Sequence, residues 1–345
     1  MCTMDVQHLF ESALKDTVKE WRDNPNVRGI FAYGSFVRGT ATRDSDLDVC
    51  VVWDGEEAPV ALMSTHKEVR IDMVFMTLRE VDDVFDEKTG DVLKIAEVIS
   101  RFRGARVVHD TRGMLKKWQQ LASDYVWSDG SINLVKTEAV ERLRRAEDYL
   151  DKMDETSAIY EMREGLFRLG RVILMTNNIF RILKPADVLT EVRLLDPMTY
   201  QLFLRTYKLR GMNEAKLLAV LEEMESWFSL AEERLESAPT DEAAIRATTL
   251  LAQAQREFYG SQVLTYAGDY ELAVLEMRQA ANSLGRSLVA VTGKMPDEEG
   301  AFIKTLRVSE PQFYKEIVLE HGAYDLQQPE IKRVIAEAQF IAYRL

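Results

Sequence analysis

The chain has few of the residues on which disulfide frameworks and zinc centres depend. Its 345 residues include two cysteines, Cys2 and Cys50, and four histidines. Cys50 is predicted to lie in a buried strand, and no histidine has a second histidine or a cysteine three or four residues away. A disulfide scaffold or a cysteine- or histidine-based zinc site is therefore not supported, and both cysteines are predicted to be plain thiols.

Long hydrophobic runs are also missing. No apolar stretch approaches the ~20 residues that a membrane-spanning helix requires. Asp5 and Glu11 fall where a signal peptide would be apolar. We therefore expect a cytoplasmic protein with no membrane partner. With 46% hydrophobic residues, a chain of this length can form two or three domains with sizeable cores.

Positive charge is in deficit, because 44 Lys and Arg residues stand against 57 Asp and Glu, a formal net charge of −13. Proteins that follow a nucleic-acid backbone usually carry a basic stripe, so nucleic acid is a disfavoured partner, although a local binding surface is not excluded. An acidic cleft attracts cations, which slightly favours a polycationic small acceptor. Acidity that serves only solubility explains the charge equally well.

The most informative stretch is Gly29 to Trp53, GIFAYGSFVRGTATRDSDLDVCVVW. It predicts a strand over 30–33, a tight turn at Gly34-Ser35, a polar loop, and a second strand over 46–53. Gly34 lets the backbone turn and approach a ligand closely. Ser35 offers a hydroxyl and an N–H, and a short helix after it would direct its positive end at phosphate.

Two acidic residues are predicted to share one face of the second strand. Because alternate side chains point to opposite faces, Asp46 and Asp48 project together, whereas Leu47 and Val49 project into a core. Neighbouring carboxylates repel each other unless a cation compensates them. Mg²⁺ is the natural compensator, since it takes oxygen ligands and completes its shell with water and substrate phosphates.

A third acidic residue, Asp72, lies among apolar residues of another predicted strand, 68–76. An unpaired charge in such a position is costly. The simplest explanation is that Asp72 lies beside Asp46 and Asp48 on a neighbouring strand, where it shares a metal or accepts a proton.

Four separated elements occur together in this sequence: Gly34-Ser35, a ten-residue interval, Asp46-x-Asp48 and the apolar-flanked Asp72. In combination they resemble the DNA polymerase beta-type nucleotidyltransferase superfamily. The resemblance covers about residues 1–110. Singly, each element has an ordinary structural explanation, since Gly-Ser turns and Asp-x-Asp at strand starts are common. Their combination favours the superfamily.

The resemblance implies that Asp46, Asp48 and Asp72 are the catalytic carboxylates and the ligands of Mg²⁺. It also implies nucleotide contacts from the first turn and the loop that follows it, namely Gly34, Ser35, Arg38 and Ser45. The segments Arg38-Gly39 and Asp44-Ser45 are most similar to the minimal and the antibiotic-modifying nucleotidyltransferases.

Hydrophobic periodicity predicts a helix over 5–22, a strand after Val27, a helix over 91–102 and a short strand over 105–109. Thr77 and Glu80 form a capping box that starts another helix, and Asp110-Thr111 can cap the next one. From Thr111 onward only helical patterns follow, over 112–125, 131–153, 157–182, 186–194, 198–209, 212–236, 241–259, 269–291, 298–306, 310–320 and 329–343.

The predicted fold class is therefore α+β, with an N-terminal nucleotidyltransferase domain at 1–110 whose mixed sheet is flanked by helices, followed by an all-α helical region. The segment 236–241 is expected to divide the helical part. Residues 111–238 would form a bundle that closes over substrate and nucleotide, and residues 239–345 a C-terminal helical region. An oligomer formed through 241–345 is compatible with the sequence.

Residues 159–197 resemble the helical domain of antibiotic nucleotidyltransferases of the kanamycin and streptomycin type, most distinctively in Asn177-Asn178 and Lys184-Pro185. In that family the helical domain supplies cationic contacts to the nucleotide, so the resemblance implies Lys184 or Arg163 as a triphosphate ligand. An ordinary surface charge is the alternative for either residue.

A general base is also required, because a hydroxyl that attacks an α-phosphate must lose its proton. Asp72 is the first candidate, and Glu161 and Glu164 on a predicted helix are the second. For these two glutamates, a solvated helix face is the favoured interpretation.

The predicted function is in-line transfer of AMP from ATP, or of another nucleoside monophosphate, to a hydroxyl of a small molecule such as an aminoglycoside-type antibiotic, with release of pyrophosphate. Two Mg²⁺ ions would assist. The alternatives are adenylylation of a protein or RNA, and a non-catalytic nucleotide-binding protein with an antitoxin-like or regulatory role.

Overall fold

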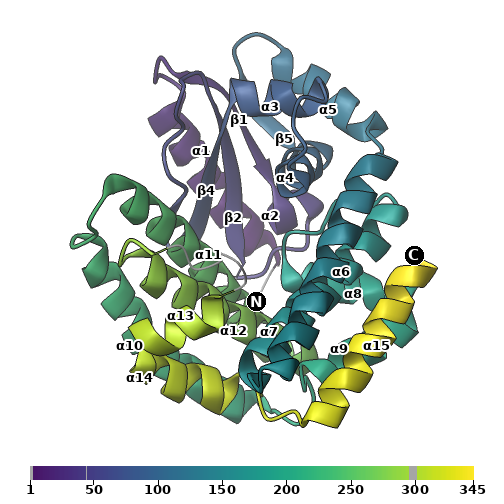
Figure 1. Cartoon of the computed structure of the whole chain (residues 1–345). Coiled ribbons are helices and arrows are strands. Elements are labelled where there is room, and N and C mark those ends of the chain that lie inside the picture. The colour runs from purple at the N-terminus through teal and green to yellow at the C-terminus, as the bar shows by residue number, and fades with distance from the viewer. Residues whose placement is uncertain (1–2, 44, 295–300) are drawn as a thin grey trace. The chain divides into compact units, whose positions relative to one another are not determined.

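The computed structural model describes residues 3–43, 45–294 and 301–345. The chain divides into two compact units, Met1–Val126 and Trp127–Leu345. The first unit holds a sheet with flanking helices, and the described part of the second is helical (Figure 1). This confirms the predicted α+β class. No helix of the described residues is long and apolar enough to cross a membrane.

The sheet has five strands in the order β3-β4-β2-β1-β5. Their bounds are β1 (Val27–Tyr33), β2 (Asp46–Trp53), β3 (Leu62–His66), β4 (Val69–Thr77) and β5 (Arg106–Asp110). Strands β2 and β4 are parallel and the other pairs antiparallel, so the sheet is mixed as expected. The edge strand β3 was not predicted, because its exposed sequence LMSTH lacks the apolar alternation that marks the other strands.

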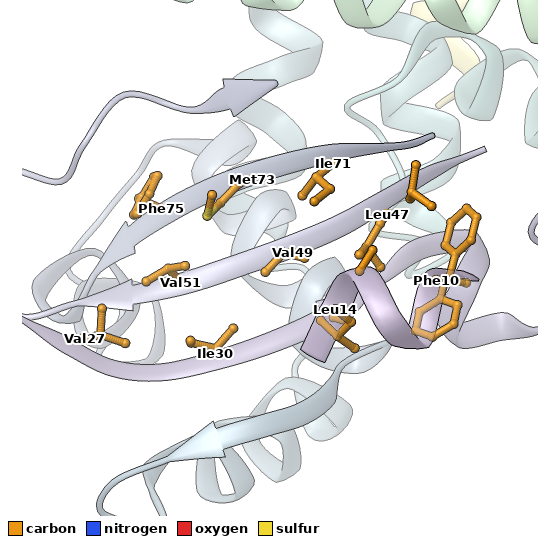
Figure 2. Close-up of a cluster of buried hydrophobic side chains, with 14 residues drawn as sticks. Phe10, Leu14, Val27, Ile30, Leu47, Val49, Val51, Ile71, Met73 and Phe75 are labelled. Carbon is orange, nitrogen blue, oxygen red and sulfur yellow. The ribbon is translucent and has the colours of Figure 1, made fainter. Parts of the chain in front are cut away.

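One face of the sheet packs against helix α1 (Thr3–Trp21) and forms the core of this unit (Figure 2). Leu47 and Val49 of β2 are fully buried there, as the period-two pattern predicts. A register slip of one residue would turn Asp48 into this apolar core, so hydrophobic burial on one face determines where the carboxylates of the other face point.

The opposite face is covered by α3 (Leu78–Phe85) and α4 (Val92–Arg103). Phe31 of β1 packs against Phe102 of α4, with ring centroids 4.8 Å apart. The predicted capping box is present, because the Thr77 hydroxyl accepts the Glu80 N–H and the Glu80 carboxylate accepts the Thr77 N–H. This cap fixes the point at which β4 turns into α3.

Helix α5 (Met114–Asp124) completes the N-terminal unit and packs against α4 and β5. Its start is stabilised by Asp110, whose carboxylate accepts the N–H groups of Met114 and Leu115 at 3.1 Å each. The capping role expected for Asp110 is confirmed, whereas the Thr111 hydroxyl instead donates to the Arg28 carbonyl. The predicted boundary at 110/111 falls before α5, and the unit extends to Val126 because of this packing.

The C-terminal unit consists of α6 (Asp129–Asp151), α7 (Glu155–Thr176), α8 (Pro185–Leu195), α9 (Pro197–Thr206), α10 (Glu214–Leu235), α11 (Asp241–Tyr266), α12 (Tyr270–Ala290), α13 (Phe302–Ser309), α14 (Pro311–Phe313), the π-helical turn η2 (Tyr314–Leu319) and α15 (Gln328–Arg344). Helix α6 packs along α7, and α11 along α12. Helix α10 contacts both α11 and α12, and the predicted division at 238/239 stays a prediction.

Several predicted helices of this unit differ in their bounds from those observed; α11, for example, is predicted to end at 259 and extends to Tyr266. The helix expected over 157–182 ends at Thr176, where Asn178 adopts a left-handed φ of 55°. The Asn178 side-chain oxygen accepts the N–H of Trp127, and the Trp127 ring stacks on Phe180. The first part of the helix expected over 298–306 lies outside the described residues, and α13 begins at Phe302.

Candidate active site

Asp48 and Asp72 lie side by side on the face of the sheet opposite α1. They are direct partners in the parallel pairing of β2 and β4, and their exposed fractions are 9% and 6%. Tyr33 is the antiparallel partner of Asp48 on the other side. Tyr33, Asp48 and Asp72 therefore form a row across β1, β2 and β4, which confirms the predicted placement of Asp72 beside Asp48.

Asp46 shares this face but is directed to a different partner. It pairs in register with Arg70 of β4, and its Oδ1 lies 3.0 Å from the Arg70 Nε. Among the described residues, no group of three His, Cys, Asp or Glu side chains is arranged to hold a metal ion. The three-carboxylate Mg²⁺ centre of Asp46, Asp48 and Asp72 therefore stays a prediction.

Gly34 approaches the carboxylate of Asp48 more closely than any other residue type could. Its φ of 76° lies in the left-handed region, and a Cβ added there would lie 1.8 Å from the Asp48 Oδ2. The glycine is therefore required both by the turn and by contact with a predicted metal ligand. The sequence indicated the turn but not this contact.

The short helix α2 (Gly34–Arg38) follows at once and ends at Gly39, which also has a left-handed φ. Ser35 belongs to α2, and its carbonyl accepts the Thr40 N–H at 3.0 Å. Arg38 is exposed in the last turn. The backbone of the predicted phosphate-contacting segment is thus held by local hydrogen bonds next to Asp48.

Ser45 immediately precedes β2 and closes the loop in front of the carboxylates. Its hydroxyl oxygen accepts the Thr42 N–H at 2.9 Å. Asp44, the other half of the predicted Asp44-Ser45 segment, lies outside the described residues. The phosphate contacts of Ser35, Arg38 and Ser45 stay predictions. What is observed is that Gly34, next to Ser35, adjoins the Asp48 carboxylate and that Ser45 directly precedes Asp46.

Two groups on the carboxylate face have raised pKa values. Burial raises the pKa of Tyr33 well above its usual value, and the neighbouring Asp48 and Asp72 add to this effect, while Arg101 opposes it. Burial also raises the pKa of Cys50 to about 12. Cys50 is therefore an inert thiol, as predicted, and Tyr33 is a neutral phenol at the edge of the site.

Lys184 and Arg163, the predicted triphosphate ligands of the helical region, occupy different environments. Lys184 is exposed at the N-cap of α8, where a nucleotide contact stays a prediction. Arg163 is 5% exposed, and its guanidinium donates to three backbone carbonyls of the same unit, those of Thr206, Gly322 and Ala323. The expectation for Arg163 is therefore wrong, because the side chain is used to join distant segments.

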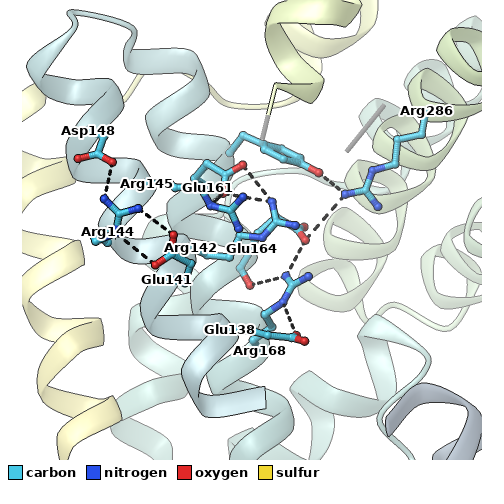
Figure 3. A network of polar contacts seen from close by, with 11 residues as sticks. Glu138, Glu141, Arg142, Arg144, Arg145, Asp148, Glu161, Glu164, Arg168 and Arg286 are labelled. Carbon is cyan, nitrogen blue, oxygen red and sulfur yellow. Dashed lines mark hydrogen bonds and ion pairs between the residues drawn. The ribbon is translucent and has the colours of Figure 1, made fainter. Parts of the chain in front are cut away.

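The solvated face predicted for Glu161 is also wrong (Figure 3). Glu161 is fully buried, and both of its carboxylate oxygens accept from Arg142, at 3.0 and 3.1 Å. Burial raises its pKa, although Arg142 and Arg145 oppose the shift. The carboxylate is thus occupied by arginines inside the helical unit.

Glu164 belongs to the same network, since it pairs with Arg168 at 2.9 Å and lies 3.9 Å from Arg286 (Figure 3). Burial acts to raise its pKa, but Arg286 and Arg168 outweigh burial and lower it to about 2. A carboxylate with so low a pKa is a weak proton acceptor at neutral pH. The two glutamates are therefore poor candidates for the base, and Asp72 is left as the first candidate.

One residue near the carboxylates was missed at the sequence level. Arg101 of α4 extends beneath the row, with its guanidinium carbon 5.3 Å from the Tyr33 ring centroid. It also forms an ion pair of 2.6 Å with Glu97, one helical turn earlier. The i, i+4 spacing of Glu97 and Arg101 in α4 was the available signal, but such pairs are usually found on solvated faces.

Known proteins resemble the N-terminal unit in sequence. Residues 14–108 match the family described as nucleotidyltransferase domain, and all three aspartates lie within this range. Protein adenylyltransferase MntA of Thermococcus cleftensis is 40% identical over 73 residues, which cover 19% of this chain and 72% of that protein. A nucleotidyltransferase-like protein of Exiguobacterium sibiricum is 11% identical over 90% of this chain and 91% of its own, with a TM-score of 0.37, a likeness too distant to carry an argument.

Proposed function

The chain belongs to the nucleotidyltransferase superfamily, and from this premise we propose that it is a Mg²⁺-dependent enzyme that moves AMP from ATP to a hydroxyl of a small-molecule acceptor. The observation that carries the proposal is the paired burial of Asp48 and Asp72 against Gly34. Two adjacent carboxylates in an apolar setting are costly for folding, and a catalytic site is the usual reason for such a cost.

The residues present fit a hard divalent cation. Asp48 and Asp72 offer carboxylate oxygens from adjacent strands, and Gly34 leaves the space beside Asp48 without a side chain. Asp46 would join them if its carboxylate turned from Arg70 toward Asp48, with which it shares a strand face. When bound, Mg²⁺ would neutralise these charges and polarise the phosphate oxygens.

The chain's own groups have distinct roles in this proposal. Ser35 and Ser45 hold the triphosphate through hydroxyl and backbone N–H groups, and the exposed cation of Arg38 contacts its outer oxygens. Asp72 accepts the proton of the acceptor hydroxyl, whose oxygen forms a bond to the α-phosphorus. The bond from the α-phosphorus to its bridging oxygen breaks, and pyrophosphate leaves. Positioning and electrostatic stabilisation supply most of the rate.

Two classes of acceptor compete. The net charge of −13 favours a cationic small molecule such as an aminoglycoside. The name of the Thermococcus cleftensis relative, protein adenylyltransferase, favours a hydroxyl on a protein. A purely regulatory nucleotide-binding role is disfavoured, because nucleotide binding alone gives no reason to bury Asp72 beside Asp48.

The experiment that tests this function incubates the full-length protein with Mg²⁺, each α-labelled NTP in turn, and a panel of aminoglycosides, proteins and RNA. Pyrophosphate release and transfer of label to the acceptor are measured. We expect both with ATP and one acceptor class, and neither in the Asp48→Ala variant. Nucleotide binding without pyrophosphate release for any acceptor would favour the regulatory alternative. Unchanged turnover in Asp48→Ala would contradict the assigned site.

A further inference from the structure

Four charged side chains of alternating sign connect the first turn of α3 with α4. Glu80, which closes the capping box, lies 2.8 Å from the Lys94 Nζ, and Lys94 lies 2.9 Å from Glu97. Glu97 in turn lies 2.6 Å from Arg101. The series is partly buried throughout, with side chains 13% to 35% exposed. It ends on a positive charge at Arg101.

Arg101 is located beneath the carboxylate row by three neighbours from three strands. Its guanidinium lies 5.3 Å from the Tyr33 ring centroid on β1, and it interacts electrostatically with Cys50 of β2 and Asp72 of β4. These residues share one face of the sheet, because Tyr33 and Asp72 both flank Asp48 and Cys50 follows Asp48 by two residues. The positive charge therefore lies on the α4 side of Asp48 and Asp72.

The positive charge of Arg101 offsets an unfavourable electrostatic interaction in the fold. Asp48 and Asp72 are adjacent and almost fully buried, so their repulsion and desolvation both oppose folding. Burial alone would lower the pKa of Arg101, but the groups around it, among them Glu97 and Asp72, raise it instead. Arg101 therefore keeps its charge in this setting.

We propose that Arg101 is a positioning residue of the nucleotidyl-transfer site, a built-in counter-charge that holds Asp72 and Asp48 together before a divalent cation binds. The proposal rests on the proposed function, since it assumes that these two carboxylates are the metal ligands. Glu97 pairs with Arg101, and Lys94 pairs with Glu97, so these ion pairs hold Arg101 in place.

The consequence is a competition between Arg101 and the metal. In the wild type, a divalent cation must enter against the field of a fixed positive charge. Without Arg101, the metal-free site is more strongly repulsive, and a cation relieves more of that repulsion when it binds. Loss of Arg101 should thus weaken the metal-free fold and strengthen the stabilisation by metal.

The test compares the wild type with Arg101→Met and with Arg103→Met as the matched control. Arg103 belongs to the same helix but donates to the backbone carbonyls of Ala122 and Tyr125. The melting temperature is followed during a Mg²⁺ titration, with a monovalent salt of equal ionic strength as reference. We expect Arg101→Met to melt several degrees lower than the wild type without Mg²⁺ and to gain several degrees more on its addition. Both variants lose a positive charge and a structural contact, so these losses are matched. Only Arg101 lies near the carboxylates, and only Arg101→Met should therefore change the response to Mg²⁺.

An equal Mg²⁺-induced rise in wild type and Arg101→Met would overturn the proposal while leaving the proposed function intact. A missing rise in both, together with intact transfer activity, would overturn the proposal and the metal assignment. The transfer activity of the proposed function is tested separately, by the assay with the panel of acceptors, and fails if no transfer occurs with any of them.

A double substitution keeps the proposal testable if Arg101→Met alone does not fold. In Arg101→Met with Asp72→Asn, both the cation and its carboxylate neighbour are neutral, so the variant should fold and melt close to Asp72→Asn alone. If the double variant also fails to fold, or melts far below Asp72→Asn alone, Arg101 does not act through Asp72 and the proposal is wrong. Arg101→Lys keeps the positive charge but lacks the planar guanidinium, so it should restore most of the metal-free stability. It should also lower kcat of transfer at least ~10-fold with little change of KM, because misplacement by a fraction of an ångström affects chemistry more than binding.

Discussion

Asp48 and Asp72 are register partners on the parallel strands β2 and β4, and each is less than a tenth exposed. Their adjacency follows from the opposite face of the same strands, because Leu47, Val49 and Ile71 are buried in the α1 core. Burying each such side chain stabilises the fold by about 1.5 to 3 kcal/mol, so this core opposes any register that would separate the two carboxylates.

The close approach of Gly34 to Asp48 predicts that Gly34→Ala abolishes activity. The added Cβ would lie 1.8 Å from the Asp48 Oδ2, so either the turn or the carboxylate must move. Gly39→Ala is the matched control, since Gly39 has a similar φ of 73° but nothing within 4 Å of an added Cβ. Both variants should lose about 1 kcal/mol from left-handed strain, and only Gly34→Ala should lose transfer activity. Steady-state rates and thermal melts measure the two effects, and an active Gly34→Ala would contradict the assignment of Asp48.

The arginine partners of Glu161 predict that this residue supports the fold and takes no part in chemistry. Glu161→Gln leaves Arg142 and Arg145 without their buried carboxylate, which should cost about 3 kcal/mol or more of unfolding free energy. Its kcat per folded molecule should stay within ~3-fold of the wild type, whereas loss of a general base in Asp72→Asn should lower kcat by ~100-fold or more. Active-site titration combined with denaturant unfolding separates the two effects. A fall in kcat for Glu161→Gln as large as for Asp72→Asn would make Glu161 the base.

The carboxylate part of the site could be predicted from the sequence because the evidence for it is local. Period-two alternation in 46–53 places Asp46 and Asp48 on one face, and the apolar neighbours of Asp72 imply burial beside them. The capping box at Thr77 and Glu80 is similarly local, since both partners lie within one helical turn. In each case the pattern itself contains the interacting groups.

The remaining features depend on partners far away in the chain. Arg163 donates to Gly322 and Ala323, which lie more than 150 residues later, so no window around Arg163 could indicate its burial. Glu161 has the same difficulty, because charged residues on helices are usually solvated and its Arg142 partner belongs to another helix. The ion pair of Asp46 with Arg70 likewise depends on strand register.

The contacts of Arg163 predict a large loss of stability in Arg163→Met. The substitution leaves the carbonyls of Thr206, Gly322 and Ala323 without their buried donor, and each such group costs about 1 to 3 kcal/mol. Arg333→Met is the control, because Arg333 is exposed and paired only with Glu337 one turn later, a contact worth about 0.3 to 0.5 kcal/mol. Denaturant unfolding followed by circular dichroism compares the two. Equal small losses would show that Arg163 is dispensable to the fold.

Two buried carboxyl groups predict that the helical unit loses stability as the pH rises. Burial raises the pKa of Glu276 to about 8, with a further contribution from Glu257, and burial raises the pKa of Glu257 to about 7. Both lie above the ordinary glutamate value of 4.5, so the neutral forms stabilise the folded state. That stability is complete below about pH 4.5 and is lost as the pH rises through 7 to 8, by up to about 1.4 kcal/mol per pH unit for each group.

Glu276→Gln tests this sign, because the amide is neutral at every pH and its oxygen can still accept the Ala186 N–H that Glu276 accepts at 2.7 Å. Unfolding free energies of the full chain, measured by denaturant titration between pH 5 and 9, should fall less steeply in Glu276→Gln than in the wild type. Glu222→Gln, at an exposed position of α10, should follow the wild-type slope. All other titrating groups are shared by the two proteins, so the difference between their curves of unfolding free energy against pH reports Glu276 alone. Parallel curves for wild type and Glu276→Gln would mean that Glu276 is already ionised in the folded protein. A steeper fall in the variant would mean that the pKa of Glu276 is lowered and not raised.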